Sequence, residues 1–236
     1  MRFLKMHYAL IASMFVFAIL AASGAAYAAS NARGNDDPHA ARGAASAVSD
    51  KQSAAEFRAD MRQLWEEHIV YTRLFIVSFA ADLPDLQPTT ERLLANQTDI
   101  GDAIKPYYGE EGGAALTELL REHILDAADL VAAAKSGDAA GFDAAKVAWY
   151  DNADRIALFL HTANPDNWPL EATQHHMRMH LDLTLDEAAH QLDGDYGQSI
   201  ADYDAVHLAI LEMSDYLSQG IIDQFPNEFR GPRNGP

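Results

Sequence analysis

Two series of polar residues recur along this chain with nearly the same period, and this repetition limits the folds that are open to it. The first series is His68, His123 and His180, with spacings of 55 and 57 residues. The second series is Asn96, Asn152 and His207, with spacings of 56 and 55 residues. Two independent series with one period indicate a structural unit that occurs three times in tandem.

The apolar residues between Ala54 and Phe229 are spaced as in amphipathic helices, and no alternating strand pattern competes with them. Ser53 and Glu56 form a capping-box pattern before the first apolar stripe. Glycine or proline stands at every break between stripes, where helices tend to end. The expected helices run from Ala54 to the Leu83-Pro84-Asp85 break, and over about 90–104, 114–135, 139–162, 169–192 and 198–225.

Six helices in three repeats predict an all-α fold. Three tandem αα-hairpins pack most simply as a six-helix bundle. The segment 54–229 is long enough for one hydrophobic core and short for two, so we expect a single domain.

The two ends of the chain have a different composition from the bundle. Residues 1–28 combine basic residues, a short apolar stretch and an Ala-Tyr-Ala cleavage pattern, which is typical of a secretory signal peptide. We expect a flexible leader over 29–53 and a disordered tail over 230–236, because neither segment has enough large apolar residues to pack. The mature protein is then periplasmic or secreted, with no membrane span after signal cleavage.

The balance of charges argues against some partners. The chain has 17 Lys and Arg against 35 Asp and Glu, a formal net charge of -18, and it has no cysteine. Nucleic acid and anionic lipid are poor partners for such a surface, because their binding depends on basic side chains. The acidity weakly favours cations such as metal ions, although it also serves simply to keep an exported protein soluble.

The six repeated polar residues fall on the apolar stripes of their helices, so we expect them to meet at one level of the interior. A buried polar group without a partner costs roughly 1–3 kcal/mol. The six groups must therefore pair with one another, with water or with a ligand. One interpretation is a closed His/Asn network, with Thr72 and Thr184 one turn along, that only specifies packing.

The other interpretation is a binding site for a transition metal or a small ligand. Imidazole suits copper, zinc, iron and nickel, and a carboxylate one turn away can complete the coordination shell. Asp204 stands three residues before His207, so both side chains are expected to point inward. Inward Glu-x-x-His pairs on two helices, as in di-iron bundles, are absent, so a metal site here would differ from that arrangement.

A second candidate site is local to the fifth expected helix. His176 and His180 are four residues apart and share a helix face, a spacing that also chelates zinc. Met177 lies between them, and a thioether together with imidazole suits copper. The alternative is that methionine at this spacing fills the core and His176 is solvated.

No catalytic motif is visible in the sequence. There is no cysteine nucleophile, no Gly-x-Ser-x-Gly elbow and no phosphate-binding glycine loop. An enzyme that uses a bound metal is therefore the least favoured of the functional hypotheses.

Several short strings stand out along the expected bundle. They are Trp65-Glu66-Glu67-His68, Thr72-Arg73, Leu83-Pro84-Asp85, Arg92-Leu93-Leu94, Asn96-Gln97, Asp99-Ile100-Gly101 and Gln224-Phe225-Pro226. These strings resemble those of an uncharacterised family of bacterial exported helical-bundle proteins. The resemblance covers about 64–229 and implies a helical bundle with no established activity, so it assigns no functional residue.

The sequence therefore predicts an exported binding protein with a central His/Asn layer that holds copper, zinc, iron or a small ligand. The rival hypothesis is a structural or interaction module. In both, we expect His68, His123, His180 and His207 to be buried together, with His39 and His190 elsewhere.

Overall fold

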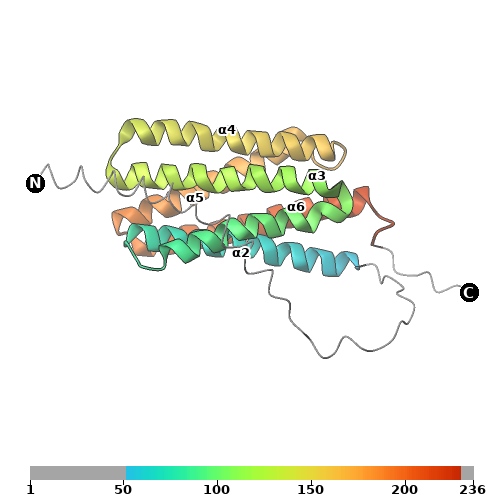
Figure 1. Cartoon of the computed structure of the whole chain (residues 1–236), viewed down its shortest axis with the longest axis horizontal. Coiled ribbons are helices and arrows are strands. Elements are labelled where there is room, and N and C mark those ends of the chain that lie inside the picture. Colours follow the sequence, from blue (N-terminus) through green and yellow to red (C-terminus); the bar gives the residue numbers. More distant parts are fainter. Residues whose placement is uncertain (1–51, 230–236) are drawn as a thin grey trace, which may run out of the picture.

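The computed structural model describes residues 52–229, and this part of the chain is built from helices without any strand. The predicted signal peptide, nearly all of the predicted leader and the predicted tail lie outside the described residues. The helices run side by side along the long axis of the molecule (Figure 1). They are α2 (Ala54–Ala80), α3 (Leu86–Ser136), α4 (Ala139–Ala163), α5 (Leu170–Asp193) and α6 (Tyr196–Gln224).

Helix α2 begins at the capping box that the sequence predicts. The Ser53 hydroxyl accepts a hydrogen bond from the Glu56 backbone N–H at 3.2 Å. The Glu56 carboxylate accepts one in return from the Ser53 N–H at 2.8 Å. Two backbone donors at the helix start are satisfied in this way, which stabilises the helix where Ser53 begins it.

Helix α3 replaces two of the helices that the sequence predicts. The expectation of a helix end before Pro106 is wrong, because the helix continues to Gly109, whose φ of 77° and ψ of 173° are not helical. The segments on either side pack against each other, and a Cβ atom added at Gly101 would lie 2.7 Å from the Gly113 carbonyl oxygen. The Thr117 hydroxyl also contacts the Gln97 carbonyl across the same boundary, at 3.5 Å. The chain therefore turns back on itself at Gly109, where glycine tolerates the positive φ.

Two other turns share one design. Gly137 ends α3 and Gly194 ends α5, both with left-handed backbones at φ of 72° and 81°. In each case the next residue is an aspartate that caps the following helix: Asp138 accepts from the Gly141 N–H and Asp195 from the Gln198 N–H. The helix stops that the sequence predicts at these glycines are confirmed, and both follow the usual C-cap preference.

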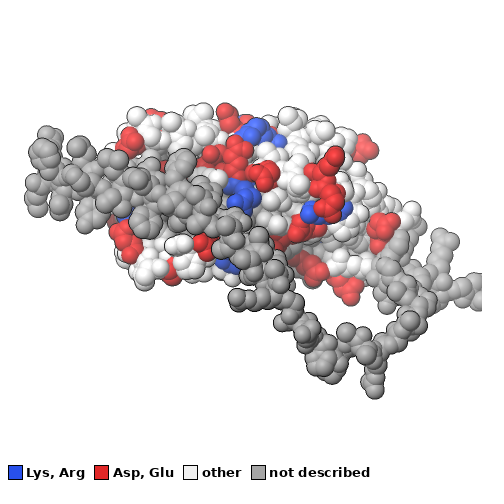
Figure 2. Space-filling model, viewed as in Figure 1, with Lys and Arg blue, Asp and Glu red and all other residues white. Residues whose placement is uncertain are grey.

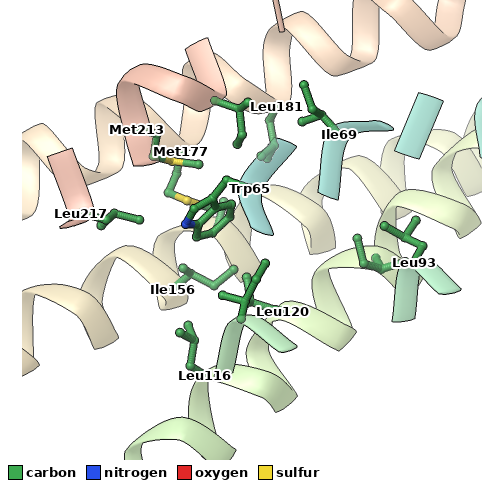
Figure 3. Packing of buried hydrophobic residues seen from close by; sticks show 14 of the residues in the cluster. Trp65, Ile69, Leu93, Leu116, Leu120, Ile156, Met177, Leu181, Met213 and Leu217 are labelled. Carbon is green, nitrogen blue, oxygen red and sulfur yellow. The ribbon is translucent and has the colours of Figure 1, made fainter. Parts of the chain in front are cut away.

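The helices enclose one cluster of apolar side chains to which all five contribute. Helix α3 packs on α2 and α4, α5 packs on α4 and α6, and α2 packs on α6, which closes the bundle. Close to one end of the bundle, the Phe57 ring lies 5.1 Å from that of Phe229 and 5.2 Å from that of Tyr107. Figure 3 shows the middle of the core, where Trp65 lies among Ile156, Met177 and Leu217.

The surface is acidic but carries many cross-helix ion pairs. Figure 2 shows acidic side chains spread over the visible face, several of them beside a basic side chain. Arg178 binds Asp154 at 2.7 Å, and Arg92 binds Glu67 at 2.6 Å. Within residues 52–229, no helix is long and apolar enough to cross a membrane.

Candidate functional site: a buried histidine cluster

Three of the four histidines that the sequence places in the interior converge in the core. His68 from α2, His123 from α3 and His180 from α5 are 3%, 3% and 4% exposed. The ring centroid of His180 lies 5.7 Å from that of His68 and 6.3 Å from that of His123. The prediction that these three are buried together is confirmed, and we call them the histidine cluster.

Both ring nitrogens of His123 have partners. Nδ1 lies 2.9 Å from Oδ1 of Asn152, and Nε2 accepts a hydrogen bond from the Trp149 indole N–H at 3.2 Å. The Asn152 amide nitrogen is directed to the Leu119 carbonyl oxygen at 3.1 Å, so its Oδ1 is free to act as an acceptor. His123 is therefore the neutral tautomer with its proton on Nδ1.

The partner of His68 is a residue that sequence reasoning missed. Nε2 of Gln97, a fully buried side chain, lies 3.3 Å from Nδ1 of His68 and donates to it. The neighbouring Asn96 is also buried, but its amide nitrogen donates to the Leu64 carbonyl oxygen at 3.0 Å. The signal that identifies Gln97 is its distance in sequence, because Gln97 follows His68, and Asn152 follows His123, by 29 residues.

His180 differs from the other two histidines. Its Nδ1 atom is buried and has no hydrogen-bond partner among the described residues. The residue at the same offset of 29 is Ala209, which is buried but offers only a methyl group. One buried imidazole nitrogen therefore lacks the amide that the other two histidines have.

The structure corrects the expected positions of His207 and Asp204. The side chain of His207 is 36% exposed and its Nε2 binds the Glu66 carboxylate at 2.9 Å. Asp204 is exposed. The burial of His207 was wrongly predicted because it stands two residues before Ala209, and two residues turn a helix by about 200°. His190 pairs with Asp202 at 2.7 Å, outside the cluster as expected, and His39 lies outside the described residues.

The second candidate site is only partly assembled. His176 is half-buried, and its ring contacts that of Tyr216 at a tilt of 31°, with 4.7 Å between centroids. Its Nδ1 atom is buried without a partner, while Met177 is packed in the core. Within residues 52–229, no group of three or more His, Asp or Glu side chains is arranged to hold a metal ion.

Burial keeps the histidine cluster neutral. Burial is the main reason that the pKa of His68 falls to about 3, and the electrostatic interaction with the neighbouring His123 adds to the shift. Burial lowers the pKa of His123 to about 4, against the effect of its hydrogen bond to Asn152. The pKa of His180 lies well below its ordinary value, first through burial and then through the two neighbouring histidines. At neutral pH the cluster thus offers uncharged imidazole groups.

The core also holds an apolar cavity of about 30 Å³, which none of the three clustered histidines lines. Side chains from all five helices line it, together with Trp168 from the α4–α5 connection. Two lining residues, Trp65 and Met177, each stand three residues, about one turn, before His68 and His180. The ring centroid of Trp65 lies 5.8 Å from that of His68, so one side chain separates the apolar cavity from the cluster.

A separate polar network, which the sequence did not predict, joins α2, α5 and α6. Arg73 binds the Glu187 carboxylate at 3.1 Å and also donates to the Ser199 hydroxyl at 2.5 Å. Glu187 is 1% exposed, and its burial raises its pKa to about 7 although Arg73 acts in the opposite direction. Every member of this network has a partner, so it is a cross-link between helices rather than a site with free groups.

In chemical terms, the cluster combines neutral imidazoles with one unpartnered nitrogen at His180, and an apolar cavity lies one side chain away from His68. That combination suits the binding of a small uncharged molecule, since one polar contact can fix its orientation while apolar walls hold the rest. Comparisons with models of protein families, with curated proteins and with solved structures give no match to this chain.

Proposed function

We propose that this chain is an exported helical-bundle protein that binds a small molecule beside His180. The observation that carries the proposal is the unpartnered Nδ1 atom of His180, in a side chain that is only 4% exposed. An unsatisfied buried polar group costs roughly 1–3 kcal/mol. A ligand that forms a hydrogen bond there removes this cost when it binds.

A small molecule fits the donor set better than copper, zinc or iron does. Metal coordination uses the lone pair of a neutral imidazole nitrogen. The Nε2 lone pair of His123 already accepts the Trp149 indole N–H, and the Nδ1 lone pair of His68 accepts the Gln97 amide. A metal would have to displace these hydrogen bonds before the three rings could coordinate it together.

We also propose that the fold is a six-helix bundle of three tandem hairpins, with Gly109 separating two antiparallel halves of α3. The support is a contact that occurs twice in the same form. Asn96 donates to the Leu64 carbonyl, four residues before His68, and Asn152 donates to the Leu119 carbonyl, four residues before His123. A repeated unit explains why both contacts have this offset.

The same contacts favour a second candidate function, a structural or interaction module. Two of the three histidines have amide partners, Gln97 and Asn152. Asn96 and Asn152 also donate to backbone carbonyls of the neighbouring helix. Such bonds fix the relative height of two helices without any ligand. In this reading the lone nitrogen of His180 binds a buried water molecule.

Export to a periplasm or to the medium remains part of the proposal. Its support is the composition of residues 1–28, with basic residues, an apolar stretch and a small-residue cleavage pattern.

The test starts from untagged protein that has been purified, denatured and analysed for released small molecules and for metals. We expect one small molecule per chain from the wild type, none from His180→Phe, and an unchanged amount from the control His190→Gln. Stoichiometric copper, zinc or iron would favour a metal site instead. Neither a molecule nor a metal, together with a His180→Phe variant at least as stable as the wild type, would favour the structural module.

A further inference from the structure

The turns at Gly137 and Gly194 have the same structure, and they set the positions of Asn152 in α4 and Ala209 in α6. Asn152 follows Gly137 by the same number of residues as Ala209 follows Gly194, and His123 and His180 precede these glycines equally. Both glycines are left-handed and both are followed by an aspartate cap. The same turn structure and the same residue spacing on both sides give α5 and α6 the register that α3 and α4 have. On this register, the Cβ atom of Ala209 faces His180 as that of Asn152 faces His123.

The Asn152 side chain shows what a group at this place binds. Its Oδ1 accepts from Nδ1–H of His123, and its amide nitrogen donates to the carbonyl oxygen four residues earlier, that of Leu119. The corresponding atoms in the third unit are Nδ1 of His180 and the carbonyl oxygen of His176. One planar group with an acceptor and a donor satisfies both at once.

We infer that a small molecule with a carboxamide group binds between His180 and Ala209 and takes the place that the Asn152 side chain fills in the second hairpin. This inference rests on the proposed function and specifies its ligand class. The unpartnered and buried Nδ1 of His180 is the group that recognises the amide oxygen.

The surroundings select an uncharged group. A carboxylate has the same shape as a carboxamide, but bringing a charge into the core is costly unless a counter-charge is present. The neighbours of His180 in the cluster are two imidazoles that burial keeps neutral, so they supply no counter-charge. The remainder of the ligand is short and apolar, because Met177, one turn before His180, borders the apolar cavity of about 30 Å³.

The experiment compares propionamide with propionate on the full chain. Propionamide at about 100 times its dissociation constant should raise the melting temperature by about 5 °C or more, whereas propionate should not. In spectra of protein with ¹⁵N-labelled histidine, the Nδ1 resonance of His180 should move and that of His190 should not.

A substitution supplies the amide covalently. Ala209→Asn should raise the melting temperature without any ligand and remove the response to propionamide, while Ala201→Asn on the exposed face of α6 should do neither. If Ala209→Asn does not fold, Asn152→Ala serves as the alternative variant for this test. This variant should melt at a lower temperature than the wild type, and propionamide should restore part of the loss.

Two results would overturn the inference. The first is a wild type that does not respond to propionamide, and the second is an Ala209→Asn variant that responds as the wild type does. If Ala209→Asn instead blocks a co-purified molecule that is not an amide, the ligand class is wrong but the proposed function stands. If no small molecule binds to the wild type at all, the proposed function fails together with the inference.

Discussion

The Trp149 indole N–H donates a hydrogen bond to Nε2 of His123 across 3.2 Å in the middle of the bundle. This bond completes the pairing of His123, whose other nitrogen binds Asn152. The ring is therefore fixed in one tautomer and one orientation, with no nitrogen left for a ligand. By contrast, the buried Nδ1 of His180 has no hydrogen-bond partner among the described residues, although its ring centroid lies only 6.3 Å from that of His123.

The first prediction concerns Asn152. Replacing it by Ala removes the partner of His123 Nδ1 and that of the Leu119 carbonyl, so we expect a loss of about 2–4 kcal/mol in the free energy of unfolding. His207→Gln changes only a partly exposed pair with Glu66 and should cost less than about 1 kcal/mol. Urea unfolding measures both, and equal losses would mean that the Asn152 contacts contribute little.

The second prediction concerns acid. The pKa values of His68, His123 and His180 are lowered in the folded state, to about 3 for His68 and about 4 for His123. Below pH 6.5 the unfolded chain therefore binds more protons than the folded chain, and stability falls as the pH decreases. Each imidazole contributes about 1.4 kcal/mol per pH unit, so the three together contribute about 4 kcal/mol per unit.

Because domains of this kind are stable by about 5–15 kcal/mol, acid unfolding should occur between about pH 5 and pH 3. The measurement is urea unfolding at a series of pH values from 7.5 to 4.5. His123→Gln should lower the slope of the unfolding free energy against pH by about 1.4 kcal/mol per unit, which corresponds to one proton. His207→Gln should leave this slope unchanged. A stability that stays flat down to pH 4.5 would show that the cluster is hydrated or already protonated.

The third prediction concerns Glu187 and has the opposite sign. Burial raises its pKa from 4.5 to about 7, so the folded state binds this proton more tightly than the unfolded chain does. The contribution of Glu187 to stability is present below pH 4.5 and is lost as the pH rises to about 7. Relative to the wild type, Glu187→Gln should therefore gain stability between pH 5 and pH 8.

We expect a gain of about 1–3 kcal/mol, measured as the difference between the two pH profiles. The exposed Glu111→Gln is the matched control and should run parallel to the wild type. A parallel profile for Glu187→Gln would mean that Arg73 holds the carboxylate ionised in spite of its burial.

The fourth prediction concerns the contact of α6 with Trp168. A Cβ atom at Gly220 would lie 2.1 Å from Nε1 of Trp168, so Gly220→Ala forces the indole or the helix to move. We expect a loss of about 1–3 kcal/mol. At Gly197, near the start of the same helix, the closest atom would be 3.9 Å away, and Gly197→Ala should be neutral or stabilising by up to about 1 kcal/mol. Thermal melting separates the two, and a neutral Gly220→Ala would show that Trp168 is loosely packed.

Helical spacing and the glycines of the turns were sufficient to predict an all-helical chain and the burial of His68, His123 and His180. Each of these histidines lies on an apolar stripe, and a stripe faces the core whatever the neighbouring helices are. The same reasoning misplaced His207, because its series was matched by residue type. The residue that follows Gly194 at the same distance as Asn152 follows Gly137 is Ala209. A search for repeated polar residues does not find it, because alanine has no polar group.

Other features depended on contacts between helices that no local pattern encodes. Gln97 stands next to Asn96, and only the rotation of α3 against α2 decides which of the two meets His68. The pairing of Arg73 with Glu187 joins residues 114 positions apart. The helix end predicted before Pro106 is wrong, because a proline near the last turn of a helix removes one hydrogen bond without ending the helix, which continues to Gly109.

The contact of Phe57 with Phe229 brings α2 and the end of the described chain together, and α2 also packs on α6. Because the two ends of the described chain are neighbours, the same packing of helices is compatible with chain ends at other turns. A circular permutant that joins residue 229 to residue 52 by a short linker, and is cut in the turn at Gly137, should keep every described contact except those of that turn. We therefore expect the packing of the helices to be independent of the order in which the chain connects them.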